Sequence, residues 1–335
     1  MRAVRLHGIG QLKFEHVDAP GALAADSVRI RVQAVGVCGS DLHNFRTGQW
    51  MSRVPVIPGH EVAGEITEVG ANVSQFRAGE LVVADSRANC GECRNCLEGR
   101  PNVCEHMGYL GEVCDGGFAE WLRLPATRVL RVPTGVEARI AALAEPLGVA
   151  LRVARRLDPA HAAPILIAGA GPIGGLAAIV LEHLGFGPLF IVDRNVARAQ
   201  LVASITGARI VSFDLQQLQR ELDGARLSYA IEATGAPAML SLVLAALSAG
   251  GRAAMVGIFS GQPALDANAL VERELELRGC SVFCDEQHEA LALLPQLAAK
   301  LERVISPPVT LEQLPQEYER LLAGHSPYLK SIVQP

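Results

Sequence analysis

The residues Ile165–Gly174 read Ile-Leu-Ile-Ala-Gly-Ala-Gly-Pro-Ile-Gly, and this stretch decides the fold of the central part of the chain. An apolar run typical of a strand leads into the pattern G-x-G-x-x-G, and a helical run follows. In such a unit the first glycine permits a tight turn, the second lets the backbone approach a pyrophosphate, and the third permits close helix–strand packing. The predicted cofactor contacts in this turn are Gly169, Gly171, Pro172, Ile173 and Gly174.

An acidic residue follows at the distance that dinucleotide sites require. Asp193 ends the next apolar run, Leu189–Val192, 19 residues after Gly174. A carboxylate there accepts hydrogen bonds from the adenosine ribose hydroxyls and repels a 2′-phosphate, which favours NAD over NADP. Arg194 beside it could hold a phosphate, so NADP stays open. The alternative is a glycine-rich turn that binds nothing, with Asp193 merely capping the next helix.

Strands and helices alternate on both sides of this turn. Such alternation is the signature of an α/β domain built on a doubly wound parallel sheet. We expect helices over 176–184 and 196–206, and further strands over 210–211, 229–231 and 255–258.

The residues before about 145 have a different pattern, with short strand-like runs in place of alternating strands and helices. Val28–Val32 alternates apolar and charged residues, as a half-buried strand does. Glu61–Val69 and Glu80–Ala84 also read as strands, and helical signals are sparse, so we expect a β-rich, barrel-like domain. The other elements expected are a connecting helix over 138–157, helices over 290–301 and 314–323, and a short final strand over 330–333.

Length and composition indicate a two-domain globular protein. The chain has 335 residues, of which 50% are hydrophobic and 19% charged, and its net charge is −5. No basic block is present, which argues against a nucleic-acid partner. The uncharged stretches 164–181 and 233–251 are broken by glycines and by Pro172 and Pro237, so we expect no membrane span and a cytoplasmic protein.

Four of the eight cysteines lie close together in the sequence. Their spacing is C-x2-C-x2-C-x7-C, and four thiolates this close can surround one tetrahedral ion, for which zinc is the usual occupant. Because all four ligands come from protein, this zinc would be structural. An iron–sulfur cluster and disulfides remain as alternatives, the latter disfavoured in a chain without a secretion signal. The predicted ligands are Cys90, Cys93, Cys96 and Cys104.

Two further motifs carry the most chemistry. They are Cys38-Gly-Ser-Asp-Leu-His43 and Gly59-His60-Glu61. Taken alone, a single cysteine in an apolar run is more often a packing residue than a ligand. Together with the nucleotide turn and the four-cysteine lobe, in this order, the motifs resemble the zinc-containing medium-chain alcohol dehydrogenase family, in its sorbitol and threonine dehydrogenase branch. The resemblance covers nearly the whole chain.

The resemblance implies a role for each matching residue. Cys38 and His60 match the first two ligands of a catalytic zinc, and Glu61 and Glu145 match carboxylates that complete or approach its ligand shell. Ser40 and His43 match the relay that passes the alcohol proton to solvent. Asp41 is expected to support these ligands rather than to react. The residues implied to contact the cofactor beyond the glycine turn are Asp193, Arg194, Arg198, Val256 and Gly257.

The resemblance also implies the architecture and the reaction. We expect a GroES-like catalytic domain over 1–146, a Rossmann domain over 147–284, and a segment over 285–335 that returns to the first domain, with substrate in the cleft where they meet. One catalytic and one structural zinc per chain, NAD, an alcohol or polyol substrate and a homo-oligomer, tetramer or dimer, are implied. The reaction is hydride transfer to NAD, with zinc as Lewis acid.

One departure from the branch concerns the substrate. Polyol dehydrogenases carry a Phe-Arg-Tyr segment where this chain has Val282-Phe283-Cys284, so the arginine that holds a substrate hydroxyl is missing. This puts a sorbitol-like substrate in doubt and leaves threonine-like and phosphorylated-polyol substrates open. Cys280 and Cys284 are interpreted as packing residues.

Other zinc-dependent functions fit the motifs less well. A zinc deaminase needs H-x-E and a later P-C-x-x-C, but His60 and Glu61 are adjacent and Asn89 precedes Cys90. A zinc hydrolase leaves the nucleotide turn unexplained. An NADP-dependent alcohol or aldehyde reductase and a non-catalytic zinc- and NAD-binding protein remain as alternatives, whereas a zinc-ribbon nucleic-acid module lacks basic and aromatic residues.

Overall fold

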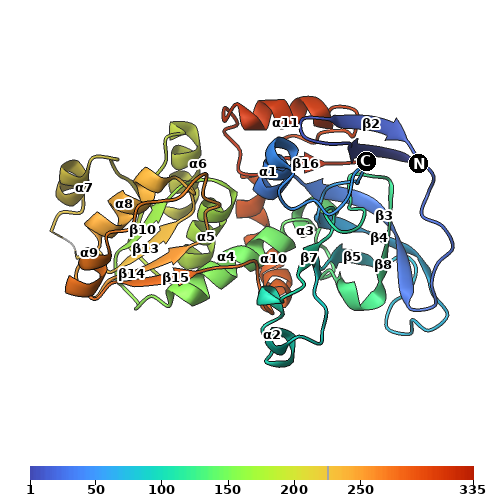
Figure 1. Ribbon diagram of the computed structural model, residues 1–335, viewed down its shortest axis with the longest axis horizontal. Helices are drawn as coiled ribbons and strands as arrows, with labels where there is room; N and C mark the ends of the chain where they lie inside the picture. The colour runs from blue at the N-terminus through green and yellow to red at the C-terminus, as the bar shows by residue number, and fades with distance from the viewer. Residues whose placement is uncertain (225) are drawn as a thin grey trace. The chain divides into compact units, whose positions relative to one another are not determined.

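The computed structural model describes residues 1–224 and 226–335 and divides into two compact units. The first unit contains Met1–Glu145, Gln287–Ser326 and Lys330–Pro335, and the second contains Pro146–Glu286 and Pro327–Leu329. Figure 1 shows the elements of both units.

The first unit is built on antiparallel strands. Its main sheet has the order β16-β3-β4-β5-β9, and β8 also pairs with β3. The first unit contains the strands β1 (Arg2–Leu6), β2 (Leu12–His16), β3 (Ser27–Gly36), β4 (Glu61–Val69), β5 (Leu81–Ala84), β6 (Arg87–Ala88), β7 (Gly108–Tyr109), β8 (Trp121–Pro125), β9 (Val129–Arg131) and β16 (Ile332–Val333), the helices α1 (Gly39–Thr47), α2 (Arg94–Leu97), α3 (Ala138–Ala141) and α11 (Leu314–Leu322), and the 3-10 turns η1 (Pro101–Val103) and η2 (Ala126–Arg128).

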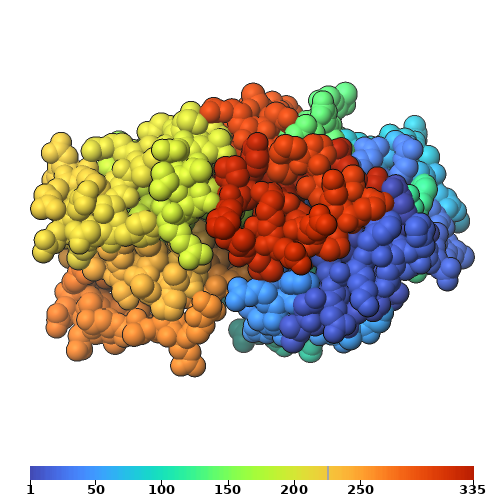
Figure 2. Space-filling model, turned by 90° about the horizontal axis from the view of Figure 1, so that it is seen from above, coloured from blue at the N-terminus to red at the C-terminus, as the bar shows by residue number. Residues whose placement is uncertain are grey.

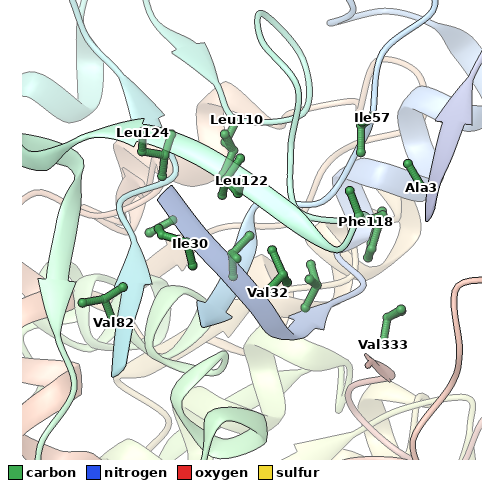
Figure 3. Packing of buried hydrophobic residues seen from close by; sticks show 14 of the residues in the cluster. Ala3, Ile30, Val32, Ile57, Val82, Leu110, Phe118, Leu122, Leu124 and Val333 are labelled. Carbon is green, nitrogen blue, oxygen red and sulfur yellow. The ribbon is translucent and has the colours of Figure 1, made fainter. Parts of the chain in front are cut away.

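The core of this unit joins residues from both ends of the chain. Alternate residues of β3, such as Ile30 and Val32, are buried against the neighbouring strands, as the alternation of the sequence predicts. Val333, from the last strand, belongs to the same cluster, and Figure 3 shows it near these side chains. The packing agrees with strand pairing, since β16 pairs antiparallel with β3. In Figure 2 the C-terminal residues, in red, lie against the N-terminal residues, in blue.

The second unit is a parallel sheet of six strands. Its order is β12-β11-β10-β13-β14-β15, so the chain starts in the middle, runs to one edge, and returns to build the other half. Helices α7 and α8 pack on one face through an apolar cluster. The elements are α4 (Ala144–Leu157), β10 (Ile165–Ala168), α5 (Pro172–His183), β11 (Leu189–Val192), α6 (Val196–Thr206), β12 (Arg209–Ile210), α7 (Leu215–Glu221), β13 (Tyr229–Glu232), α8 (Pro237–Ala246), β14 (Arg252–Met255), α9 (Ala267–Glu272) and β15 (Glu276–Gly279). Helix α10 (Glu286–Glu302) belongs to the first unit from Gln287 on.

The predicted fold class, a β-rich domain with a doubly wound parallel sheet, is confirmed, with local differences. The connecting helix predicted over 138–157 is two helices, because the chain turns at Ala142 and Leu143 between α3 and α4. The strand predicted over 255–258 ends at Met255, since the backbone N–H groups of Val256 and Gly257 both donate to the carbonyl of Glu232.

None of the helices within residues 1–224 and 226–335 is long and apolar enough to span a membrane.

Candidate metal and nucleotide sites

Cys38 lies at the start of helix α1, where its geometry is fixed by the helix itself. The backbone N–H of Cys38 donates to Asp41 Oδ2 at 2.9 Å, and the sulfur of Cys38 accepts from the backbone N–H of Asp41. This reciprocal pattern is a capping box, which satisfies amides that the first turn of a helix leaves without partners. The Cys38 sulfur is therefore held in place by the motif that contains it.

Asp41 also orients His60. Its Oδ1 lies 3.6 Å from His60 Nδ1, and both side chains are buried. Burial by itself lowers the pKa of His60, but the charges of Asp41 and Cys38 raise it well above its ordinary value. With Nδ1 directed at a carboxylate, Nε2 is the nitrogen left for a ligand, the arrangement by which carboxylates fix metal-binding imidazoles.

Glu61 is fully buried at the start of β4 and is paired with Lys330 from the end of the chain. Lys330 Nζ bonds Glu61 Oε1 and also donates to the carbonyl of Val37 at 3.3 Å. Burial lowers the pKa of Lys330, but Glu61 and Cys38 more than offset this and raise it. Gly36 leaves room for the carboxylate, because a Cβ at Gly36 would lie 1.9 Å from Glu61 Oε2.

The atoms of this cluster suit a metal ion. Ligand atoms of Cys38, His60 and Glu61 all lie within 4.8 Å of one another. Glu61 Oε2 is buried and has no hydrogen-bond partner among the described residues, a costly arrangement unless a cation or another donor meets it. Sulfur, imidazole nitrogen and carboxylate oxygen together are a donor set that zinc accepts, and three protein ligands leave a fourth position open.

Glu145 is the other carboxylate predicted for this site. It is buried near the start of α4 and accepts a hydrogen bond from Ser86 Oγ at 2.9 Å. Burial raises its pKa to about 7, a rise that the charge of His60 opposes and that of Glu61 reinforces. Glu145 therefore lies within electrostatic range of the cluster but outside the group of three ligand atoms that the structure brings together.

The two predicted relay residues lie on α1, in different settings. Ser40 Oγ is 3.5 Å from His60 Nε2. His43 is further along the helix, where Nε2 is 2.8 Å from Gln49 Oε1 and the ring stacks on Trp50 with centroids 4.4 Å apart.

The four cysteines of the second motif also form one cluster. Their sulfurs lie within 4.8 Å of one another around the short helix α2, and no disulfide joins any of the eight cysteines. Backbone N–H groups of Cys90 and His106 donate to Cys104 Sγ, and that of Cys93 donates to Cys90 Sγ. Backbone donors lower the pKa of Cys93 to about 6, whereas desolvation raises that of Cys96 to about 12. The closed set of four sulfurs fits a structural zinc.

The glycine turn has the close contacts that its pattern predicts. Gly169 has φ +104°, a conformation that side chains rarely tolerate, and a Cβ at Gly174 would lie 1.9 Å from Gly169 O. Gly171 caps α5, whose first residue is Pro172. The first turn of α5 therefore follows directly on the glycine turn, the arrangement in which helix N–H groups bind anions, and Ile173 is half-buried there.

The predicted adenosine contacts surround Asp193. Its Oδ2 accepts from the backbone N–H of Ala170 at 2.6 Å, and its Oδ1 accepts from that of Asn195 at 2.6 Å. Arg194 is exposed, and Arg198 is half-buried with its backbone N–H bonded to Asn195 Oδ1. The carboxylate thus ties the glycine turn to the loop before α6.

Val256 and Gly257 lie beyond β14, beside a carboxylate that we did not predict. Glu232 is fully buried and accepts from the backbone of Thr234 at 2.9 Å and from that of Gly235 at 3.1 Å. A Cβ at Gly257 would lie 2.5 Å from Glu232 Oε2. The sequence offers one weak signal for this site: a glutamate at a strand end, followed by Ala-Thr-Gly, resembles the glycine turn at Gly169–Gly174 only slightly.

Comparisons with known proteins agree with this geometry. Residues 24–134 match the alcohol dehydrogenase GroES-like domain, and residues 172–298 match the zinc-binding dehydrogenase family. Sorbitol dehydrogenase of Bacillus subtilis (strain 168) is 30% identical over 100% of this chain and 97% of its own length. L-threonine 3-dehydrogenase of Shewanella frigidimarina (strain NCIMB 400) is 30% identical over 92% and 93%. The structure of galactitol-1-phosphate dehydrogenase from Escherichia coli superimposes with a TM-score of 0.92, at 25% identity and full coverage of both chains.

Proposed function

The chain belongs to the zinc-containing medium-chain alcohol dehydrogenase family, in its sorbitol and threonine dehydrogenase branch, and on this premise we propose that it oxidises a secondary alcohol of a polyol or hydroxy amino acid with NAD. The observation that carries the proposal is the cluster of Cys38, His60 and Glu61, in which one carboxylate oxygen of Glu61, Oε2, is buried without a hydrogen-bond partner among the described residues. The relatives' named substrates, sorbitol, L-threonine and a sugar-alcohol phosphate, supply the substrate classes.

Each residue of the site has a part in this chemistry. Cys38, His60 and Glu61 hold the metal, and Asp41 keeps the His60 ring turned with Nε2 outward. A zinc ion there supplies Lewis acidity toward the alcohol oxygen, and a nicotinamide cofactor at the glycine turn supplies the hydride acceptor. Ser40 Oγ accepts the hydroxyl proton of the alcohol as it gives up its own, and His43 releases one proton to solvent, so one proton leaves the site for each alcohol deprotonated.

The choice of NAD rests on Asp193. Its carboxylate lies at the end of β11, beside the glycine turn, where a 2′-phosphate would meet like charge. Exposed Arg194 is the feature that favours NADP. We further propose a homo-oligomer, tetramer or dimer, as the family resemblance implies, and a cytoplasmic location.

Replacing Asp193 with asparagine tests the cofactor. Losing a charge-assisted pair costs about 1.5–3 kcal/mol, so kcat/KM for NAD should fall roughly 10- to 100-fold while that for NADP stays level or rises. Steady-state kinetics with both cofactors measure this. The matched control is Asp214→Asn, which removes a carboxylate that, like Asp193, accepts from a backbone N–H, here at the start of α7. A wild-type preference for NADP, lost in Arg194→Ala, would establish NADP as the cofactor and favour the NADP-dependent alternative.

Zinc removal tests the reaction. NADH formation is measured with L-threonine, sorbitol, butanediol and a phosphorylated polyol, before and after a chelator removes the metal, with zinc content verified. We expect turnover of at least one compound, a loss of roughly 20-fold or more after stripping, and recovery on adding zinc, because the metal contributes several kcal/mol to such steps. Full turnover after verified removal contradicts the proposal. Cofactor binding without turnover of any compound would favour the non-catalytic alternative.

A further inference from the structure

A buried carboxylate–amide pair lies next to the candidate catalytic cluster. Asn44 Nδ2 donates to Glu112 Oε1 at 3.0 Å, and these side chains are 5% and 7% exposed. Glu112 comes from the loop after β7, and Asn44 lies in α1, 68 residues earlier. Burying a carboxylate is costly, and the hydrogen bond from Asn44 offsets part of that cost.

Asn44 also forms hydrogen bonds with the segment that follows α1, and so connects Glu112 to that segment. Its Oδ1 accepts from the backbone N–H of Trp50 at 3.1 Å, and its carbonyl accepts from Gly48, the αL residue that ends the helix. The Glu112 loop holds the same segment from a second point, because Ser52 Oγ donates to the carbonyl of Glu112 at 3.1 Å. The turn carrying Trp50 is thus fixed at two places.

That turn holds the imidazole of His43. The ring of Trp50 stacks on the ring of His43 at an interplanar angle of 29°, and Gln49 Oε1 lies 2.8 Å from His43 Nε2. His43 itself is half-buried, and both of these neighbours contact its ring. A proton relay needs its imidazole at hydrogen-bond distance from its partners, and small displacements slow the transfer.

We propose that Glu112, acting through Asn44 and Trp50, is a positioning residue for His43. The inference rests on the proposed dehydrogenase function, in which His43 passes the alcohol proton to solvent. Glu112 touches no reacting atom. Its role is to accept the Asn44 hydrogen bond and so to keep the Trp50 turn against the imidazole.

Paired substitutions separate the hydrogen bond from the charge. Glu112→Ala removes the acceptor, and Asn44→Asp sets two carboxylates against each other while keeping an acceptor for Trp50. Each variant should lower kcat about tenfold and change the KM for NAD little. The loss is smaller than the roughly 100- to 10,000-fold that an acid–base group typically contributes, because His43 itself is still present. Glu112→Gln keeps an acceptor for Asn44 and should retain at least about half of the wild-type kcat. The double variant N44D/E112Q reverses donor and acceptor and should recover most of the loss in N44D.

A spectroscopic measurement reports the Trp50 turn without requiring turnover. The chain has two tryptophans, Trp50 and Trp121, so a Trp121→Phe background leaves Trp50 as the only indole. In that background Glu112→Ala should shift the Trp50 emission to longer wavelength and increase its quenching by acrylamide, because the ring leaves its stack. Glu112→Gln should leave both unchanged. Zinc content is measured in every variant, and it should equal that of the parent.

The outcomes distinguish this inference from the proposed function. A wild-type enzyme without zinc-dependent turnover contradicts the function, and the relay role of His43 with it. Turnover in the wild type, with unchanged kinetics and emission in Glu112→Ala, overturns the inference alone. An equal loss in Glu112→Gln and Glu112→Ala, or no recovery in N44D/E112Q, also overturns it, since the charge rather than the hydrogen bond would then matter.

Discussion

Replacing Cys38 with alanine is expected to lower kcat/KM for the alcohol about a thousandfold and to remove one of two zinc ions from each chain. The sulfur is one of three ligand atoms within 4.8 Å of one another, and the other two cannot close a tetrahedral site. A Lewis acid contributes several kcal/mol to alcohol oxidation, and each 1.36 kcal/mol corresponds to tenfold in rate. Steady-state kinetics and metal analysis measure both effects. NAD binding should persist, because the glycine turn and Asp193 belong to the other unit.

Two matched cysteine variants make this result specific. Cys280→Ala replaces a half-buried cysteine at the end of β15 and should leave turnover and metal content unchanged. Cys93→Ser removes a proposed ligand of the four-cysteine cluster and should also lower the zinc content by about one per chain. Its main effect should be a lower free energy of unfolding, because structural zinc contributes folding free energy. Full activity with two bound zinc ions in Cys38→Ala would show that the metal site lies elsewhere.

The parts of the candidate site that the sequence predicts are those whose geometry is set by residues close together in the sequence. Cys38 and Asp41 form the capping box of their own helix, and His60 directly precedes Glu61, the first residue of β4. The glycine turn is likewise local, because Gly169 and Gly174 contact each other within one strand–turn–helix unit. Patterns of this kind survive in the sequence because each fixes its geometry over a few residues.

Contacts between distant residues were not predictable in the same way. Lys330 meets Glu61 across 269 positions, and a lone lysine before the last strand carries no signal of its burial. Asn44 and Glu112 are similar, since neither stands in a motif. Helix α1 was missed because Gly39 and the polar residues after it suggest a loop, whereas the capping box and packing decide in favour of a helix.

Some strands were not predicted because charged residues interrupt their apolar pattern. The short edge strand β15 was not predicted, because Glu276-Leu277-Arg278-Gly279 is half polar and pairs only with β14. An edge strand tolerates charged residues, and a strand that contains them lacks the apolar run from which strands are predicted. The β1–β2 pair was missed for the same reason, since Lys13 and Glu15 interrupt its second strand.

Replacing Lys330 with methionine is expected to destabilise the first unit by about 3–5 kcal/mol in the zinc-free protein. The side chains of Lys330 and Glu61 are both 0% exposed, so removing the ammonium leaves a buried carboxylate without its counter-charge. Methionine keeps the apolar volume of the lysine stem, which limits the cavity contribution. Urea unfolding followed by tryptophan emission measures the effect, because Trp50 and Trp121 both lie in the first unit.

The double variant K330M/E61Q separates charge from packing. Removing both charges should recover most of the stability lost in Lys330→Met, since replacing a whole buried pair costs far less than breaking it. Zinc should also narrow the difference between Lys330→Met and the wild type, because a cation at Glu61 Oε2 compensates the same carboxylate. A loss below about 1 kcal/mol in the zinc-free single variant would mean that Glu61 is satisfied without Lys330. The C-terminal strand would then close the sheet without also holding the metal ligand.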